Sequence, residues 1–283
     1  MKLIADGGST KVHWRLSDGN RPVADIFTPG MNPSVMPAAT LRAILETDLI
    51  PQLPENIAVS SVEYYGAGCR GEACHTMRQA LGAALPHAAE ITVDSDMLGA
   101  CVAMSRGIRS IVCILGTGAN SCLFDGEKII GNVPPLGYIL GDEGSGAWLG
   151  KTLVADVLKE ILPEAICREF HRRYPYGYDE LIRRVYRPAE GDTPPNSFMA
   201  TFAPFLSEHI DCPEIEHIVV TGFTLFFERN IMLYSRQEKP EVSHGTLPLY
   251  FTGSVAYAFR KQLEDVASRY SLPRPSVRRS PLG

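Results

Sequence analysis

The chain has 283 residues, of which 45% are hydrophobic and 21% are charged, and its formal net charge is −5. This length fits two domains of roughly 100–200 residues each. Because acidic and basic residues are interspersed, a broad surface for nucleic acid or anionic membrane is not expected. No apolar run approaches the ~20 residues of a membrane span, and the first residues are typical of a strand rather than a signal peptide. A cytoplasmic protein is expected.

In the first half of the chain, three strands precede alternating helices and strands. The strands are expected at residues 2–5, 11–17, 22–28, 61–65 and 91–93, and the helices at residues 36–49, 71–85 and 97–105. This β-β-β-α-β-α-β-α order is typical of an α/β domain with a mixed sheet.

The second half begins in the same way, with strands at residues 111–115, 121–124 and 128–130. From Ser145 onward Leu149, Leu153 and Val157 have helical spacing. Residues 213–234 contain the strand-like run Ile-Val-Val, yet their apolar residues recur at three and four, so a helix is predicted despite Gly222. A strand at 247–252, a helix at 254–270 and a strand at 276–279 follow, with surface loops at the proline-rich residues 188–195 and 240–248.

The seven cysteines are odd in number and include no C-x-x-C pair, so structural zinc is not expected. Cys101, Cys113 and Cys122 lie in apolar segments and are predicted to be buried, reduced thiols. The seven histidines show no metal-ligand spacing.

Two strand–hairpin–strand units contain phosphate-binding residue types. The first turn holds Asp6, Gly7, Gly8, Ser9, Thr10 and Lys11, and the second holds Gly116, Thr117 and Gly118. Glycines let backbone N–H groups approach an anion, and hydroxyls add donors. A carboxylate one residue upstream, Asp6, is suited to hold Mg²⁺, often through water. One such loop is usually a mere turn, but two at equivalent positions indicate a nucleotide held between duplicated halves.

Neither hairpin is a helix-capping phosphate loop, because the chain lacks G-x-x-x-x-G-K-[ST] and G-x-G-x-x-G. The arrangement resembles the actin/hexokinase/Hsp70 superfamily. The G-D-E-G-S-G run at residues 141–146 is similar to that of N-acetylglucosamine kinases and the related BadF/BadG-type ATPases. The resemblance extends from Asp6 to residues 253–256. It implies two ribonuclease H-like, actin-like ATPase domains with mixed sheets flanking a nucleotide cleft, at residues 1–106 and 107–283, the second with a helical insertion.

The resemblance also assigns roles at the reacting end of the site. Asp96 and Gly99 match the family's D-x-x-G pattern, so Asp96 is the expected general base, although Asp also favours a helix N-cap. Asp94 does not match the pattern. Gly253 and Ser254 resemble the adenosine-binding turn. Lys11 is expected to reach a phosphate, with a plain surface lysine as the alternative reading.

Substrate contacts are implied for a set of residues from both halves, with Asn32 and Asp142 as the main acceptors for sugar hydroxyls. The set comprises Asn32, Gly66, Gly68, Asp96, Ala119, Asn120, Gly137 and Asp142. A turn asparagine and a helix-capping aspartate are the alternative readings of the two main residues, and Glu143 is expected to order its loop.

Two departures from the family pattern concern the sugar loop and the end of the chain. Animal-type N-acetylglucosamine kinases have a glycine pair shortly before Gly137, whereas this chain has Pro134 and Pro135, which removes two backbone donors. Sugar identity is therefore left open. Residues 280–283 come where relatives often continue into a closing helix.

The expected function is an ATP- and Mg²⁺-dependent kinase that phosphorylates an N-acetylated amino sugar, foremost N-acetylglucosamine at its 6-hydroxyl. N-acetylmuramate is the alternative substrate. An ATPase that activates a partner reductase or dehydratase, and a sugar-binding regulator without catalysis, are the alternative classes. Expected partners are the sugar and ATP, without nucleic acid or membrane, and a homodimer is left open.

Overall fold

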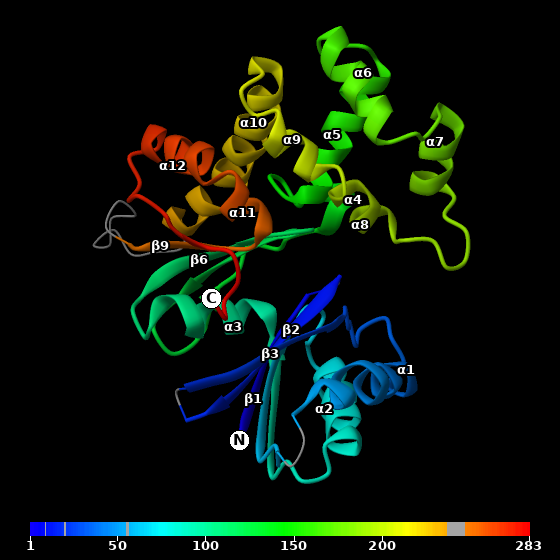
Figure 1. Ribbon diagram of the computed structural model, residues 1–283. Helices are drawn as coiled ribbons and strands as arrows, with labels where there is room; N and C mark the ends of the chain where they lie inside the picture. Colours follow the sequence, from blue (N-terminus) through cyan, green and yellow to red (C-terminus); the bar gives the residue numbers. More distant parts are fainter. Residues whose placement is uncertain (9, 20, 55–56, 237–246) are drawn as a thin grey trace. The chain divides into compact units, whose positions relative to one another are not determined.

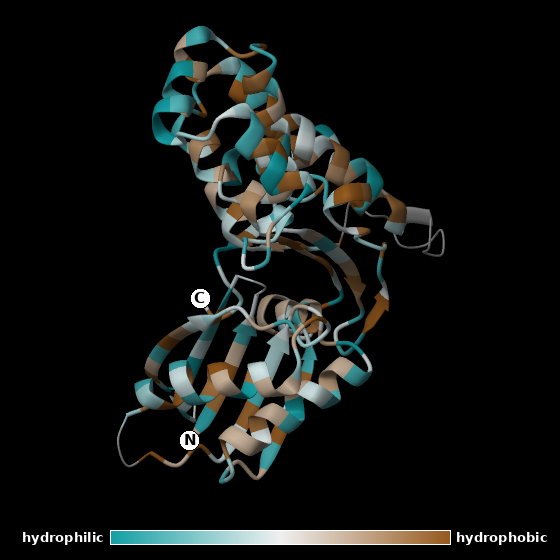
Figure 2. Ribbon diagram, turned by 90° about the vertical axis from the view of Figure 1, so that its right-hand side faces the viewer, coloured by the Kyte–Doolittle hydropathy of each residue, from teal (hydrophilic) through white to brown (hydrophobic). Residues whose placement is uncertain are grey.

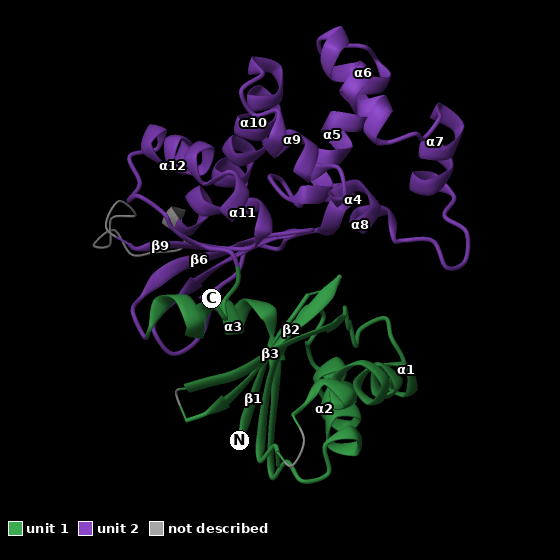
Figure 3. Cartoon of the chain, viewed as in Figure 1, with its two compact units in different colours: residues 1–106, 280–283 green, residues 107–279 purple. Residues whose placement is uncertain are grey.

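The structure is a computed structural model that describes residues 1–8, 10–19, 21–54, 57–236 and 247–283. The chain forms two compact units (Figure 3). Unit 1 contains Met1–Arg106 together with Ser280–Gly283, and unit 2 contains Gly107–Arg279. The assignment of domains at residues 1–106 and 107–283 stays a prediction.

Unit 1 is built on a mixed five-stranded sheet of order β3-β2-β1-β4-β5 (Figure 1). The pairs β1–β2 and β2–β3 are antiparallel, and the pairs β1–β4 and β4–β5 are parallel. The strands are β1 Lys2–Gly7, β2 Lys11–Asp18, β3 Arg21–Pro29, β4 Ser61–Gly66 and β5 Glu90–Ser95. All five strands were predicted at these places, and the mixed sheet is confirmed.

The alternation of side chains along β4 separates two faces of this sheet. Val62 and Tyr64 lie in a hydrophobic core with Leu3 and Ala5 of β1, beside helices α1 (Ala38–Ile44) and α2 (Glu72–Ala84). Tyr65 points the other way, toward α3 (Asp96–Ser105). The sheet thus holds α3 on the face opposite to α1 and α2.

The predicted helix at residues 36–49 is shorter and less regular than expected. Its α-helical part starts at Ala38, behind the N-cap Pro37, and a π-helical turn Leu45–Leu49 and a 3₁₀ turn Ile50–Gln52 follow. Pro51 has no N–H and its ring would collide with the carbonyl four residues earlier, so a regular α-helix cannot continue through it.

Unit 2 repeats the topology of unit 1, with a sheet of order β10-β9-β6-β7-β8. Here β6–β7 and β7–β8 are antiparallel, and β6–β9 and β9–β10 are parallel. The strands are β6 Ser110–Leu115, β7 Ala119–Phe124, β8 Ile129–Gly131, β9 Leu249–Thr252 and β10 Ser276–Arg278. In both sheets the first strand is central, the second and third extend to one side, and the fourth and fifth extend to the other.

Helices fill the connection between β8 and β9 of unit 2. They are α4 Gly137–Leu140, α5 Gly146–Leu158, α6 Glu164–Arg173, α7 Tyr178–Tyr186, α8 Pro195–Ala200, α9 Ala203–Glu208 and α10 Pro213–Arg229, followed by a 3₁₀ segment Ile231–Arg236. The predicted helix from Pro213 is confirmed. Gly222 allows α10 to approach α5, because a Cβ there would lie 2.9 Å from the Trp148 ring.

Three sequence predictions for unit 2 need correction. The single helix expected at residues 254–270 is two helices, α11 Ser254–Ala258 and α12 Arg260–Arg269, with Phe259 outside helical geometry (φ −110°, ψ 33°). Phe259 is buried against Phe223, and that packing outweighs continuation of the helix.

The strand β9 begins at Leu249, because Pro248 has no N–H for the ladder. The loop at 188–195 ends at Pro194, and most of the loop at 240–248 lies outside the described residues.

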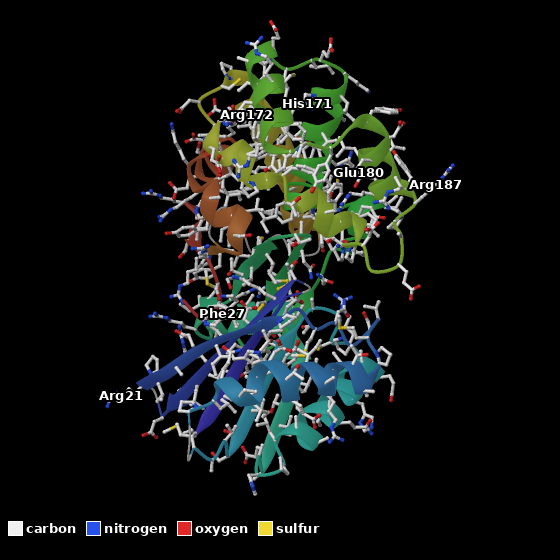
Figure 4. All side chains as sticks on the ribbon, turned by 45° about the vertical axis from the view of Figure 1, so that its right-hand side comes forward. Arg21, Phe27, His171, Arg172, Glu180 and Arg187 are labelled. Carbon is white, nitrogen blue, oxygen red and sulfur yellow. The ribbon has the colours of Figure 1, made fainter. Side chains whose placement is uncertain are left out.

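The outer helices of unit 2 carry ion pairs at helical spacing. Arg172 binds Glu169 and Arg184 binds Glu180. Arg187, directly after α7, points outward in Figure 4. Hydrophobic and hydrophilic residues alternate around the helices of both units (Figure 2), as expected of helices with one buried side. Within the described ranges, none of the helices has the length and hydropathy needed to cross a membrane.

Candidate active site

The first hairpin joins β1 to β2 by a tight turn. Gly8 N–H donates to the Lys11 carbonyl at 3.0 Å, and Gly30 N–H donates to the Thr10 carbonyl at 3.0 Å. Lys11 Nζ lies 5.2 Å from the centroid of the Phe27 ring, a cation–π contact on the neighbouring strand β3. The Lys11 ammonium is therefore held beside an aromatic ring in this structure. Ser9 lies outside the described residues.

Two glycines at the end of the first sheet surround the Tyr64 phenol. A Cβ on Gly7 would lie 2.5 Å from the Tyr64 hydroxyl oxygen, and a Cβ on Gly66 would overlap the Tyr64 ring. The Tyr64 hydroxyl donates to the Met31 carbonyl at 3.1 Å. These glycines are thus required for packing, and they leave backbone rather than side chains at the sheet edge where a ligand is expected.

Asp6 occupies the last part of β1, and it is half-buried. The Ser280 hydroxyl donates to Asp6 Oδ2 at 3.0 Å. Burial raises the pKa of Asp6, and the Ser280 hydrogen bond and the charges of His13 and Lys11 oppose that rise. Ser280, His13 and Lys11 therefore favour the ionised form of Asp6, which is the form that would bind a cation.

Asp96 begins α3 directly after β5. The N-cap is Ser95, whose Oγ accepts from Leu98 N–H at 3.2 Å, so Asp96 does not fill the capping role. Asp96 Oδ1 accepts from Met97 N–H at 2.8 Å. Burial raises the pKa of Asp96, the negative charge of Asp6 raises it further, and Arg70 lowers it. A carboxyl with a raised pKa is suited to exchange a proton.

Gly99 gives the D-x-x-G pattern a physical reason in this chain. A Cβ at Gly99 would lie 2.5 Å from Cβ of Tyr65, so any larger residue would push α3 away from β4. Glycine at this helix position therefore lets α3 hold Asp96 close to the sheet. Asp94 lies within β5, in register with Tyr65 of β4, and its Oδ1 accepts from Ser95 N–H at 2.7 Å.

Asn32 and Gly68 come from different loops and are in contact. Asn32 Oδ1 accepts from the N–H and the hydroxyl of Ser34 at 3.0 and 2.6 Å, which are the hydrogen bonds of a turn asparagine. Gly68 has φ +79°, and a Cβ there would overlap Asn32 Oδ1. The structure thus brings Asn32, Gly66 and Gly68 together at one end of the first sheet.

The second hairpin joins β6 to β7 and is bound to the start of α5. Gly116 N–H donates to the Gly118 carbonyl at 3.0 Å. The carbonyls of Gly116 and Thr117 accept from Gly146 and Ala147 N–H at 2.8 and 3.0 Å. The α5 terminus thereby fixes the shape of this hairpin.

Asp142 is buried beside that hairpin in a backbone conformation that is unusual outside glycine (φ +56°). Its Oδ1 accepts from Ala119 N–H at 3.1 Å, and a Cβ on Gly118 would lie 3.2 Å from Oδ2. Burial raises the pKa of Asp142, and the Ala119 hydrogen bond opposes the rise. The helix cap is Ser145, so Asp142 does not fill the capping role.

Glu143 and Asn120 make contacts that order their surroundings. Glu143 Oε1 accepts from Arg229 of α10 at 2.9 Å, in keeping with the predicted loop-ordering role. Asn120 Oδ1 accepts from Ser121 N–H and Asn132 Nδ2 at 2.9 and 3.0 Å.

The proline pair is linked to Asp142 through the backbone. Asp142 N–H donates to the Pro135 carbonyl at 3.2 Å. Leu136 (φ +60°) and Gly137 (φ +73°) follow in left-handed conformation and lead into α4. The path of residues 134–137 thus helps to determine where Asp142 lies.

Gly253 directly follows β9, and its counterpart in unit 1, Gly66, is the last residue of β4. The φ of Gly253 is +117°, and a Cβ would overlap the Leu115 carbonyl at the base of the second hairpin. Gly253 N–H donates to the Arg278 carbonyl at 3.2 Å, and Ser254 follows as the exposed first residue of α11. This close backbone approach leaves no room for a side chain, as the adenosine-turn interpretation requires.

The sequence reasoning missed two residues near the carboxylates of unit 1. Ser280 reaches Asp6 from 274 positions away, and no local pattern indicates such a contact. Arg70 lies in the loop after β4, next to Gly68, and its charge acts on Asp96. The G-A-G-C-R run could have drawn attention to Arg70, because loops after parallel strands line ligand crevices.

The residues present fit a magnesium nucleotide. Unit 1 offers the half-buried carboxylate Asp6 beside a glycine hairpin, and carboxylates are ligands that Mg²⁺ prefers. Unit 2 offers a second hairpin and, beside it, a turn at Gly253 that has no side chain. Such a turn would allow the adenine and ribose of a nucleotide to lie against the backbone. Among the described residues, no cluster of three or more His, Cys, Asp and Glu is placed to hold a metal ion. Bound Mg²⁺ usually keeps several waters and uses one or two carboxylates together with phosphate oxygens.

Comparison with solved structures identifies the fold. The chain matches the "putative N-acetylglucosamine kinase" of Porphyromonas gingivalis at 38% identity and a TM-score of 0.92, covering 100% of this chain and 96% of that chain. A second "putative N-acetylglucosamine kinase", from Chromobacterium violaceum, matches at 19% identity and 0.62, covering 99% and 94%. MreB 5 of Spiroplasma citri matches at 12% and 0.58, covering 98% and 90%. No family model and no curated protein matches.

The two sheets of equal topology and these similarities define the fold as that of the actin-like ATPases. Within that class, the identity and full coverage of the Porphyromonas structure show the family. The chain belongs to the N-acetylglucosamine kinase-like, BadF/BadG-type ATPase family of the actin/hexokinase/Hsp70 superfamily.

Proposed function

We propose that this protein is an ATP- and Mg²⁺-dependent kinase that phosphorylates an N-acetylated amino sugar, foremost N-acetylglucosamine at its 6-hydroxyl. The observation that carries the proposal is the 38% identity over the whole chain to a protein described as a putative N-acetylglucosamine kinase. The half-buried Asp96 with its raised pKa supports the transfer chemistry. N-acetylmuramate is the closest alternative substrate.

When bound, ATP supplies the phosphoryl group and Mg²⁺ offsets its charge. Asp6 would hold the cation, and N–H and hydroxyl groups of the hairpins at Gly7–Lys11 and Gly116–Gly118 would bind phosphate oxygens. Gly253 and Ser254 would receive the adenosine. Asn32 and Asp142 would accept hydrogen bonds from sugar hydroxyls, with Gly66, Gly68, Ala119, Asn120 and Gly137 lining the sugar site.

Asp96 would take the proton of the accepting hydroxyl as that oxygen attacks phosphorus. Its raised pKa makes Asp96 a better proton acceptor than an ordinary aspartate. The neighbouring negative charge of Asp6 disfavours ionisation of Asp96, and a cation held at Asp6 would relieve that effect.

A coupled assay of ADP release tests the proposal across N-acetylglucosamine, N-acetylmuramate, N-acetylmannosamine and glucose, with NMR of the product to locate the phosphate. We expect turnover that requires an N-acetylated sugar, with phosphate at the 6-position. ATP turnover that no sugar changes would reject the kinase and favour the partner-activating ATPase. Phosphorylation of N-acetylmuramate far ahead of N-acetylglucosamine would replace the substrate but keep the reaction.

A further inference from the structure

The last four residues, Ser280–Gly283, belong to unit 1 although they follow unit 2 in the chain. They meet β1 and β2 at two points. The Ser280 hydroxyl donates to Asp6 Oδ2 at 3.0 Å, and the Arg15 guanidinium donates to the Leu282 carbonyl. This segment therefore contacts Asp6, the carboxylate that we propose as the cation ligand.

The orientation of the Ser280 hydroxyl is fixed by its second hydrogen bond. Leu282 N–H donates to Ser280 Oγ at 3.2 Å. A serine hydroxyl has a single hydrogen to donate, so acceptance from Leu282 leaves that hydrogen for Asp6. The segment thus presents a donor of defined direction to the carboxylate.

Arg15 is itself held in place, which makes the second contact well defined. Its Nε and one terminal nitrogen donate to Asp25 Oδ1 and Oδ2 at 2.8 and 3.0 Å, a two-pronged pair. His13 Nε2 lies 2.9 Å from the same Asp25 Oδ1, and His13 is the register partner of Asp6 across β1 and β2. A network on β2 and β3 therefore supports the segment that holds Asp6.

We propose that Ser280 is a positioning residue that fixes the Asp6 carboxylate for the metal ion of a bound nucleotide. This inference rests on the proposed function, in which Asp6 holds Mg²⁺. The Ser280 bond uses one oxygen of the carboxylate and restricts its rotation, so the remaining lone pairs keep one direction. Partners of metal-ligating carboxylates act in this way, and their loss typically lowers metal affinity by about 10–100-fold.

The test measures binding, not turnover. The affinity of the full chain for ADP is determined by calorimetry with and without Mn²⁺, and the gain in affinity due to Mn²⁺ is the readout. We expect Ser280→Ala to reduce that gain about tenfold while leaving the affinity for metal-free ADP unchanged. Ser280→Thr, which keeps the hydroxyl, should restore it, and the exposed Ser276→Ala is the matched control.

Asp6→Asn completes a double-mutant cycle. If Ser280 acts through Asp6, Ser280→Ala should have no further effect in the Asp6→Asn background. Ser280→Ala with an unchanged Mn²⁺ gain would overturn the proposal, as would an equal loss of affinity for ADP with and without Mn²⁺, which indicates a merely structural role. Because no sugar enters this experiment, a failure of the sugar-kinase proposal is seen separately.

Discussion

The two units share one strand topology but place different chemistry at equivalent positions. The first hairpin follows the carboxylate Asp6, whereas the second follows Leu115, a buried apolar residue. In unit 1, α3 begins with Asp96 directly after the fifth strand. In unit 2, the start of α5 is bound to the hairpin carbonyls. The duplicated fold thus presents the carboxylates of Asp6 and Asp96 in one unit, and in the other a hairpin bound to the start of α5 beside Asp142.

The strand that ends beside each hairpin shows the same divergence. Gly66, the last residue of β4, leaves room for the Tyr64 ring, while Gly253, directly after β9, leaves room for the Leu115 carbonyl. A glycine stands at the same topological place in both units, yet it accommodates a side chain in one and backbone in the other. Equivalent glycines are therefore no evidence of equivalent ligands.

The largest effect is expected for Asp96, the proposed general base in unit 1, and it tests whether the two units differ in their roles. Asp96→Asn should fold normally and bind ATP, but lose about 10²–10⁴-fold in kcat, because removal of a general base typically costs that much. Steady-state kinetics with saturating sugar measure it. Asp94→Asn is the matched control and should be milder. A loss below about tenfold for Asp96→Asn would remove Asp96 from the role.

The corresponding change in unit 2 should affect binding rather than chemistry. Asp142→Asn keeps an acceptor for Ala119 N–H, and asparagine tolerates the positive φ at this position. Loss of the charged acceptor should raise KM for the sugar by roughly 10–100-fold, because hydrogen bonds to charged groups contribute about 1.5–3 kcal/mol. KM for ATP is the internal control. A fall in kcat as large as that of Asp96→Asn would contradict the proposal that unit 1 provides the catalytic carboxylate and unit 2 a residue that only binds sugar.

A smaller effect is expected for the loop that positions Asp142. Replacing Pro134 and Pro135 by glycine in one variant should change the ratio of kcat/KM between N-acetylglucosamine and N-acetylmuramate by about tenfold, as altered pocket walls do. The phosphorylated position should stay the same. Unchanged ratios among these sugars and glucose would show that this loop does not determine selectivity.

The smallest effect is a shift in pH dependence that originates in unit 1. A general base at Asp96 would act when ionised, so we expect activity to fall as the pH drops through the pKa of Asp96, which burial has raised. Arg70 opposes that rise, and Arg70→Gln should therefore move the acidic limb of the kcat profile to higher pH. Arg21→Gln, at the exposed start of β3 (Figure 4), is the matched control. A limb at unchanged pH would mean that another group titrates in that limb.

The sequence predicted the strands well because short apolar runs between turn residues have few alternatives. It also predicted the helix at Pro213, where spacing of three and four outweighed the β-branched run. It did not predict the break at Phe259 or the π-helical turn at Leu45–Leu49, because burial against distant partners and a later proline decide them. Both depend on context that periodicity does not contain.

For the candidate site, the local motifs led to Asp6, Asp96 and Asp142, and their roles stay predictions. No local pattern indicates that Ser95, not Asp96, caps α3, or that Lys11 lies over Phe27. The Asp6–Ser280 contact could not be predicted, because it joins residues at nearly opposite ends of the chain without a shared motif.

The return of Ser280–Gly283 to unit 1 has a consequence for how the protein is made. A ribosome synthesises Asp6 early, and the serine that donates to it is added 274 residues later, after the whole of unit 2. Domains generally begin to fold during synthesis from the N-terminal side, so the sheet of unit 1 can form on the nascent chain while its acidic residue still lacks this partner. The Asp6 carboxylate would then gain its Ser280 hydrogen bond only when translation has passed residue 280.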